Sequence, residues 1–474
     1  MALVDGFDPV GRLWIGRAQA ADARSCVEAP PLDGALLIDL ASRSADSTDE
    51  GNIVQHTPAA ALRPGSVEDI AKMIGFCRKC GIKVAARGQH HTTFGQGLSS
   101  GLIIENRWLN TTHSIGPEGA DVDAGVLWFD MIRQSFAQGL TPPVLTGYTQ
   151  LSIAGTLSVG GVSLTNGKGA QVDRVQELQV VTGKGEIVWC SEHHERDLFE
   201  AVLAGLGQCG IITRARVDLV RAKSMARQYT IQYTEVAALF RDMRTLLHRG
   251  ELDGMYAICV PSGANSAYLL LPTIYFNQSS PPDNNHLLRG LSVSPGAAAV
   301  QDLGYVDQVT LVDALYNNLA ATMMFDQLIK PWFDVFLPDH AVEQYVSDVV
   351  PTLTPEDVGP TGFVLILAQK RSELTRPFFR VPDTGSDWTY LFDILTSSSG
   401  PGANPAFVSK MLARNRKLFE KARAAGGTRY PIGSIPFDHR DWVVQYGKVW
   451  DRFVELKNRF DPDDILTPGL GIFP

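Results

Sequence analysis

The sequence has 474 residues, of which 45% are hydrophobic and 20% are charged, and its 42 Lys and Arg stand against 51 Asp and Glu. This length exceeds one ordinary hydrophobic core, so we expect two domains or one domain with a large insertion. The net charge of -9 argues against nucleic acid as the main partner, because phosphate binding requires a concentrated positive surface.

The amino-terminal segment MALVDGFDPVGRLWIG carries acids where a secretory signal has a basic region, and it lacks a continuous apolar run. We therefore expect a cytoplasmic protein. No apolar run approaches the roughly 20 residues that span a bilayer, so no membrane partner is expected. The six cysteines show no disulfide framework. Cys77 and Cys80 lack the second pair that zinc requires, so we expect both on a helix and no metal site.

The predicted elements of the first half begin with a helix. Ser66 opens a capping box, and apolar residues then recur at helical spacing until Gly81. We expect strands over residues 82–86 and 102–104, on either side of the loop ARGQHHTTFGQG.

Further along the chain we expect a short strand near Val122 and an amphipathic helix over residues 128–136. Residues 175–181 and 186–189 flank the turn sequence Thr-Gly-Lys-Gly, which predicts a β-hairpin.

The segment GLGQCG satisfies the GxGxxG pattern of dinucleotide-binding loops. Here, however, a predicted helix over residues 196–203 precedes it and a predicted strand over residues 211–220 follows. In a Rossmann unit the strand comes first and the helix follows, so that pyrophosphate lies at the helix N-terminus. We therefore interpret GLGQCG as a tight turn.

The sequence changes character beyond residue 221. TIQYT, MYAICV and AYLLLP indicate strands and AALFRDMRTLL indicates a helix, without glycine-rich loops between them. Residues 279–300 are rich in Pro, Ser and Asn, which predicts a surface loop. From about Ser434 the sequence again becomes dense in motifs.

Two segments have the composition of ligand-binding loops. ARGQHHTTFGQG places two adjacent histidines and two hydroxyl residues among glycines, which fits a metal, a bare phosphate, or a cofactor with both a phosphate and a ring. Adjacent histidines rarely face one ion and no carboxylate lies nearby, which disfavours the metal. SIAGTLSVGG has side chains small enough for backbone amides to approach a ligand.

These segments, with DLFEAVLAGLGQCGIITRARV and the tail FVELKNRFDPDDILTPGLGIF, carry a resemblance to a known family. The chain resembles FAD-linked oxidases of the vanillyl-alcohol oxidase (PCMH) type, most closely the cytokinin dehydrogenase and berberine-bridge-like branch. The resemblance implies an α+β fold in which residues 1–220 and 431–474 form a two-subdomain PCMH-type FAD-binding domain. Residues 221–430 are expected to form an inserted α+β substrate domain.

The resemblance also implies that FAD is attached covalently, through the imidazole of His91, to the methyl group on the dimethylbenzene edge of the flavin. The family has glycine at the preceding position, where this chain has His90. SIAGTLSVGG contains no cysteine, so a second linkage is not expected. The remaining cofactor-binding residues implied by the resemblance are Arg87, Gly88, Gln89, His90, Thr92, Gln96, Thr156, Ser158, Gly161, Ile212, Thr467 and Leu470.

The expected catalytic residues depart from the family pattern. Cytokinin dehydrogenases have an aspartate before the tyrosine of the TDY-like segment, and this chain has Gly147 before Tyr148. We expect Tyr148, as a phenol of lowered pKa, to act as the base, with Asp438 as a second candidate. The first hypothesis is an FAD-dependent oxidoreductase of specialised metabolism that oxidises an alcohol or amine, with oxygen or another electron acceptor as a partner. The alternative is a flavin scaffold that catalyses a non-redox cyclisation or isomerisation of a metabolite.

Overall fold

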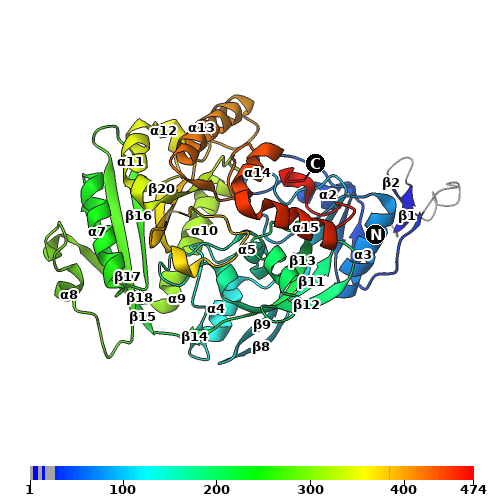
Figure 1. Ribbon diagram of the computed structural model, residues 1–474, viewed down its shortest axis with the longest axis horizontal. Helices are drawn as coiled ribbons and strands as arrows, with labels where there is room; N and C mark the ends of the chain where they lie inside the picture. The colour runs from blue at the N-terminus through cyan, green and yellow to red at the C-terminus, as the bar shows by residue number, and fades with distance from the viewer. Residues whose placement is uncertain (1–3, 9–12, 17–26, 384, 474) are drawn as a thin grey trace.

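The computed structural model describes residues 4–8, 13–16, 27–383 and 385–473. Three larger β-sheets and the helices around them build an α+β fold (Figure 1). Five cysteines of the described chain are free thiols, and Cys26 lies outside the described residues. Small strands β1 (Val4–Asp8), β2 (Leu13–Gly16) and β3 (Val27–Glu28) pair with one another near the amino terminus.

The first of these sheets carries the opening loop. Its order is β4-β5-β7-β6, and the last three strands run parallel. The strands are β4 (Ala35–Leu37), β5 (Ala60–Arg63), β6 (Val84–Arg87) and β7 (Leu102–Glu105). Helix α3 (Val67–Cys80) packs on this sheet, capped by the Ser66 hydroxyl and ended by Gly81 at φ 63°. The predicted helix and its two limits are confirmed.

The second sheet is antiparallel, in the order β12-β11-β13-β9-β8. The strands are β8 (Thr112–Gly116), β9 (Gly119–Asp123), β11 (Val175–Thr182), β12 (Ile187–Ser191) and β13 (Gly210–Val217). The associated helices are α4 (Trp128–Phe136), α5 (Ile153–Val159) and α6 (Arg196–Val202). The predicted hairpin is formed by β11 and β12, and GLGQCG is the turn from α6 into β13, so both predictions are confirmed.

The third sheet has eight strands in the order β18-β15-β17-β16-β20-β21-β19-β22, all from the chain between Met225 and Arg429. The strands are β15 (Met225–Tyr233), β16 (Gly254–Val260), β17 (Ala267–Phe276), β18 (Ala299–Gly304), β19 (Phe333–Pro338), β20 (Val364–Lys370), β21 (Trp388–Ile394) and β22 (Thr428–Arg429). Helices α7 (Val236–Arg249) and α11 (Asp339–Val349) share one hydrophobic core with this sheet, and α13 (Pro405–Ala424) adds side chains to that core.

The prediction of a continuous loop over residues 279–300 is wrong in part. The segment contains helix α8 (Asn284–Leu288), whose Leu287 and Leu288 are buried in the core of the eight-stranded sheet. Strand β18 then begins at Ala299 and pairs with β15. Two apolar side chains among many polar ones are enough to fix a short helix once a sheet offers them a surface.

The end of the chain returns to the first two sheets. Helices α14 (His439–Tyr446) and α15 (Trp450–Phe460) precede a tail in which Leu466 forms a parallel bridge with Val84 of β6. Lys457 anchors the tail, because its buried ammonium group binds Asp461 at 2.7 Å and the carbonyl oxygen of Gln208 at 3.1 Å. The division into residues 1–220, 221–430 and 431–474 stays a prediction.

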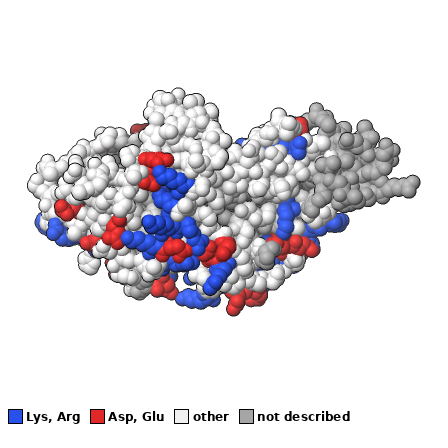
Figure 2. All heavy atoms as spheres, turned by 90° about the horizontal axis from the view of Figure 1, so that it is seen from above, with Lys and Arg blue, Asp and Glu red and all other residues white. Residues whose placement is uncertain are grey.

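The surface in Figure 2 carries a band of intermixed acidic and basic residues. Ion pairs are frequent on the helices near the end of the chain, as between Asp197 and both Arg452 and Arg459. None of the described helices combines the length and the apolar character needed to cross a membrane. Within the described ranges, no three His, Cys, Asp or Glu side chains are grouped so as to hold a metal ion.

Candidate active site

A cavity of about 280 Å³ lies where the opening loop, the α5 segment, the GLGQCG turn and the tail converge. Residues of the eight-stranded sheet and of the segment after β22 close it, including Leu367, Leu391, Asp393 and Tyr430. The cavity therefore has one wall of glycine-rich backbone and another of apolar side chains, as small-molecule and cofactor sites do.

All thirteen residues that we expected to bind the cofactor line this one cavity. They are Arg87, Gly88, Gln89, His90, His91, Thr92, Gln96, Thr156, Ser158, Gly161, Ile212, Thr467 and Leu470. Four chain segments between Arg87 and Leu470 thus meet at the same place, and Tyr148 lies there too. Asp438 is not among the lining residues.

The backbone of this wall suits a phosphate-bearing cofactor. In the described chain, the backbone N–H groups of Gly88, Gln89, His91 and Thr92 donate no hydrogen bond. The buried hydroxyl of Ser152 likewise has no partner there, and a Cβ at Gly88 would lie 1.9 Å from its oxygen. A cluster of unused donors, with a close approach of backbone and Ser152 at Gly88, fits an anionic group such as a pyrophosphate.

Several lining side chains fix the wall through their polar atoms. The Thr92 hydroxyl donates to Asp49 at 3.2 Å, and the Gln96 amide donates to the Ile432 carbonyl at 2.9 Å. The Thr156 hydroxyl accepts from the Trp128 indole at 2.8 Å. These contacts engage the polar side-chain atoms of Thr92, Gln96 and Thr156 and fix the shape of the loops. The atoms of these residues that remain to face a ligand are backbone and apolar atoms.

His91 lines the cavity beside Tyr148, and an aromatic cage that includes two further rings surrounds it. Its ring centroid is 4.9 Å from that of Tyr148, 5.7 Å from that of Tyr316 and 5.3 Å from that of Trp332. Burial, and then the charge of Lys330, lowers the pKa of His91 to about 3. The imidazole is therefore neutral near pH 7, and one ring nitrogen keeps the lone pair that a nucleophile needs.

His90 has a backbone conformation that L-residues rarely adopt. Its φ is 44°, in the left-handed region that glycine occupies at little cost. This conformation explains why the family has glycine at this position. In this chain the strained backbone at His90 places a second imidazole on the cavity wall. A hydrogen bond holds the backbone at this position, because the N–H of Glu50 donates to the His90 carbonyl oxygen at 2.9 Å.

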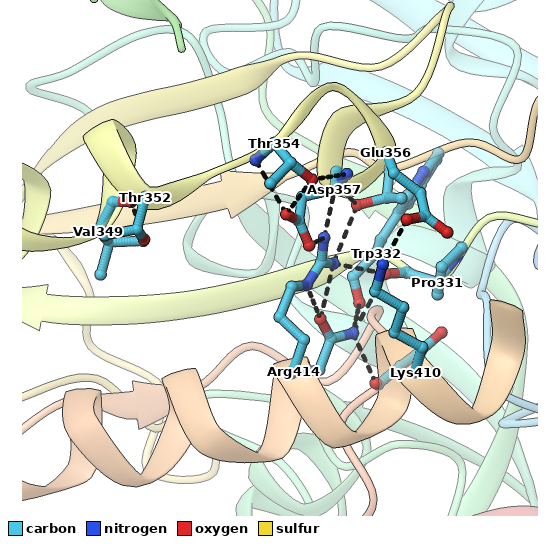
Figure 3. Close-up of polar contacts among 12 residues, drawn as sticks. Pro331, Trp332, Val349, Thr352, Thr354, Glu356, Asp357, Lys410 and Arg414 are labelled. Carbon is cyan, nitrogen blue, oxygen red and sulfur yellow. Dashed lines mark hydrogen bonds and ion pairs between the residues drawn. The ribbon is translucent and has the colours of Figure 1, made fainter. Parts of the chain in front are cut away.

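The segment that carries Trp332 is held by helix α13. Asn415 donates to the carbonyl oxygens of Pro331 and Trp332, both at 3.1 Å. Figure 3 shows Arg414 reaching from the same helix toward Asp357, with Pro331 and Trp332 beside it. This network fixes one wall of the cage around His91.

The ionisation expected for Tyr148 needs correction. Burial, followed by the charges of Glu50 and Asp313, raises the pKa of Tyr148 to about 12, whereas we expected a lowered pKa. The phenol is therefore protonated at physiological pH and can donate a hydrogen bond, and its role as a base stays a prediction. Neighbouring carboxylates and burial both oppose the phenolate.

Asp438 has a structural position. It is the N-cap of α14, where its carboxylate accepts from the N–H of Asp441 at 2.8 Å in a capping box. The geometry gives it no access to the cavity, and our expectation of a catalytic role there has no support.

Two acidic residues of the site were missed by the sequence reasoning. Asp393 lines the cavity, and Asp334 lies directly opposite it across the β19–β21 pair. A signal was present, because each acid interrupts a strand of apolar residues, in FDVFLP and in YLFDIL. A carboxyl group in such a strand is buried and needs a reason to be there.

Comparison with known proteins identifies the family. Residues 58–191 match the family model of an FAD-binding domain, and residues 224–473, more than half of the chain, match the model described as cytokinin dehydrogenase 1, FAD and cytokinin binding. The chain belongs to the cytokinin dehydrogenase family. It is accordingly an FAD-dependent oxidoreductase with the α+β fold of PCMH-type flavoproteins.

Relatives match over nearly their whole length. An uncharacterized oxidoreductase, ORF5 of the fasciation locus of Rhodococcoides fascians, is 32% identical over 424 residues, which cover 89% of this chain and 95% of the relative. Cytokinin dehydrogenase 2 of Arabidopsis thaliana is 29% identical, over 91% of this chain and 92% of its own. Cytokinin dehydrogenase 8 of Oryza sativa subsp. indica is 30% identical, over 90% of each.

Proposed function

We propose that this protein oxidises an alcohol or amine of a small organic substrate by hydride transfer to FAD bound covalently through His91. The observation that carries the proposal is the position of His91, a half-buried neutral imidazole on the wall of the cavity where all four cofactor segments meet. FAD, when bound, supplies the two-electron acceptor for this chemistry.

The residues of the chain divide the remaining work. The opening loop around Gly88 offers backbone donors to the phosphates, and the tail residues Thr467 and Leu470 close the other side. Tyr148, protonated because of its raised pKa, donates a hydrogen bond to a substrate heteroatom or to a neighbouring group. Apolar Leu367 and Leu391 exclude water from the place where a substrate lies.

The substrate class follows from what faces the cavity. Its wall presents much apolar surface, and Tyr148 and Asp393 are polar side chains suited to an O–H or N–H group. Relatives are named cytokinin dehydrogenases, which makes a cytokinin one candidate. Gly147 stands where those enzymes have their acidic base, so this chain would need another proton acceptor for any such substrate.

The test is anaerobic reduction of the purified holoenzyme. A panel of secondary amines and alcohols, with N6-isopentenyladenine among them, is added under argon while flavin absorbance is recorded. Bleaching by a compound, followed by recovery when oxygen or an artificial acceptor is admitted, supports the proposal. Consumption of a compound while the flavin stays oxidised would instead support the non-redox alternative.

A further inference from the structure

Two buried carboxyl groups face each other beside the cavity. Asp334 on β19 and Asp393 on β21 are direct partners in the antiparallel register, with 0% and 4% of their surfaces exposed. Their strand neighbours Phe333 and Phe392 point into the core of the eight-stranded sheet. Because side chains alternate along a strand, both acids lie on the opposite face, toward the cavity.

Most of the pair's carboxyl oxygens receive no hydrogen bond from the described chain. Both carboxyl oxygens of Asp334 and one of Asp393 are buried without a hydrogen-bond partner in the described chain. Burial raises the pKa of Asp334 to about 7 and, with the charge of Asp334, raises the pKa of Asp393 well above its usual range. Two like charges this close cannot both form, so near neutral pH the pair holds one proton between them.

The surroundings favour a single negative charge. Arg429 on β22 is fully buried, and its positive charge acts on Asp334. Tyr430 and Tyr316 are the other titratable groups that interact with the pair, and the pKa of each is raised, so both stay neutral. Asp334 is also tightly packed, since a Cβ at Gly433 would lie 2.0 Å from its carboxylate oxygen.

We propose that Asp393, paired with Asp334, accepts the proton that a substrate loses on oxidation, in place of the acid missing at Gly147. This inference rests on the proposed function. Asp393 is the member of the pair that lines the cavity, and Asp334 acts as its positioning residue.

The step balances as follows. The substrate C–H bond breaks and its hydrogen leaves with the electron pair to oxidised FAD. The substrate O–H or N–H bond breaks and its proton passes to Asp393, while the proton that Asp393 already holds moves to Asp334, so that the pair becomes doubly protonated. A C=O or C=N double bond forms in the product, and the pair returns its extra proton to water before the next turnover.

The test is the pH dependence of flavin reduction under anaerobic conditions, with the compound of the panel that bleaches the flavin fastest. We expect the wild-type rate constant to rise with pH through a midpoint near the pKa of Asp334, about 7. Asp393→Asn should lower the limiting rate by about 100-fold or more and abolish this midpoint. Asp334→Asn should keep the rate within about tenfold but move the midpoint away from about 7, because Asp393 then ionises without its partner.

Infrared spectroscopy of the resting holoenzyme gives a readout that needs no substrate. We expect a C=O band of a protonated carboxyl group that weakens as the pH rises through about 7 and disappears in the double variant Asp334→Asn with Asp393→Asn. Absence of this band overturns the inference even if no compound reduces the flavin. Asp302→Asn, on an exposed ion pair with Arg227, is the control and should change neither readout.

The two proposals fail in different ways. If no compound of the panel bleaches the flavin, the proposed function is contradicted. If bleaching occurs and Asp393→Asn leaves both the rate and the midpoint unchanged, only the role of the carboxyl pair is overturned. A variant of Asp334 that merely disturbed packing would lower the yield of folded protein without moving the midpoint.

Discussion

The ammonium group of Lys330 lies 2.9 Å from a carboxylate oxygen of Glu50, and the Lys330 side chain is fully buried. This ion pair acts on the cage around the expected flavin linkage. Lys330 contributes to the lowered pKa of His91, and Glu50 contributes to the raised pKa of Tyr148. The imidazole of His91 and the phenol of Tyr148 are therefore both kept neutral, by burial and by the charges of this ion pair.

Breaking this pair from one side should be costly. Lys330→Met leaves the Glu50 carboxylate in a buried position without its partner, which we expect to lower the free energy of unfolding by about 3 kcal/mol. The double variant Glu50→Gln with Lys330→Met removes both charges and should recover most of the loss. Thermal unfolding of the three proteins measures this, and equal midpoints for wild type and Lys330→Met would contradict the account.

His90→Gly should make the protein more stable. The left-handed φ of 44° costs an L-residue about 1 kcal/mol that glycine does not incur, although glycine loses some of this gain through its freer unfolded chain. We expect a higher thermal midpoint for His90→Gly than for wild type. His90→Ala keeps the Cβ and should leave the midpoint unchanged. A lower midpoint for the glycine variant would show that the second imidazole makes a stabilising contact.

Much of this architecture could be predicted because its signals are local. The helix between Ser66 and Gly81, the hairpin around residues 182–186 and the turn GLGQCG each depend on residues a few positions apart. The opening loop was assigned from its composition and its resemblance to a family. All thirteen predicted cofactor residues line one cavity, because the resemblance identified the segments that meet there.

The remaining features depend on distant partners. Asp334 and Asp393 meet only because β19 pairs with β21, a register that no local pattern specifies. The ionisation of Tyr148 was predicted with the wrong sign, since its pKa depends on burial and on the nearby charges of Glu50 and Asp313. Such environments belong to the assembled fold rather than to any segment.

Tyr148→Phe tests the role of the phenol. With its pKa raised to about 12, Tyr148 carries its proton throughout the range from about pH 5 to about pH 9. We expect flavin reduction to slow by less than about tenfold, with the shape of its pH profile unchanged, because only a hydrogen bond is lost. Disappearance of an ionisation from the profile would mean that Tyr148 is the base after all.

Gly147→Asp tests the missing acid directly. A Cβ at Gly147 would lie 3.8 Å from its nearest neighbours, Leu164 and Val312, so the variant should fold normally. We expect it to reduce its flavin with N6-isopentenyladenine at least about tenfold faster than wild type, since a positioned base contributes at least this much. Gly147→Asn has the same shape without the base, and an equal gain from both variants would refute the explanation.

The most direct test of the account is the location of the flavin after the fold is destroyed. The purified protein is denatured in acid, the chain is separated from small molecules, and its peptides are mapped by flavin absorbance and mass. We predict that the flavin stays on the peptide containing His91 and that His91→Ala releases it as free FAD. Release of all flavin as free FAD from the wild-type chain would contradict the covalent linkage on which the proposed function is built.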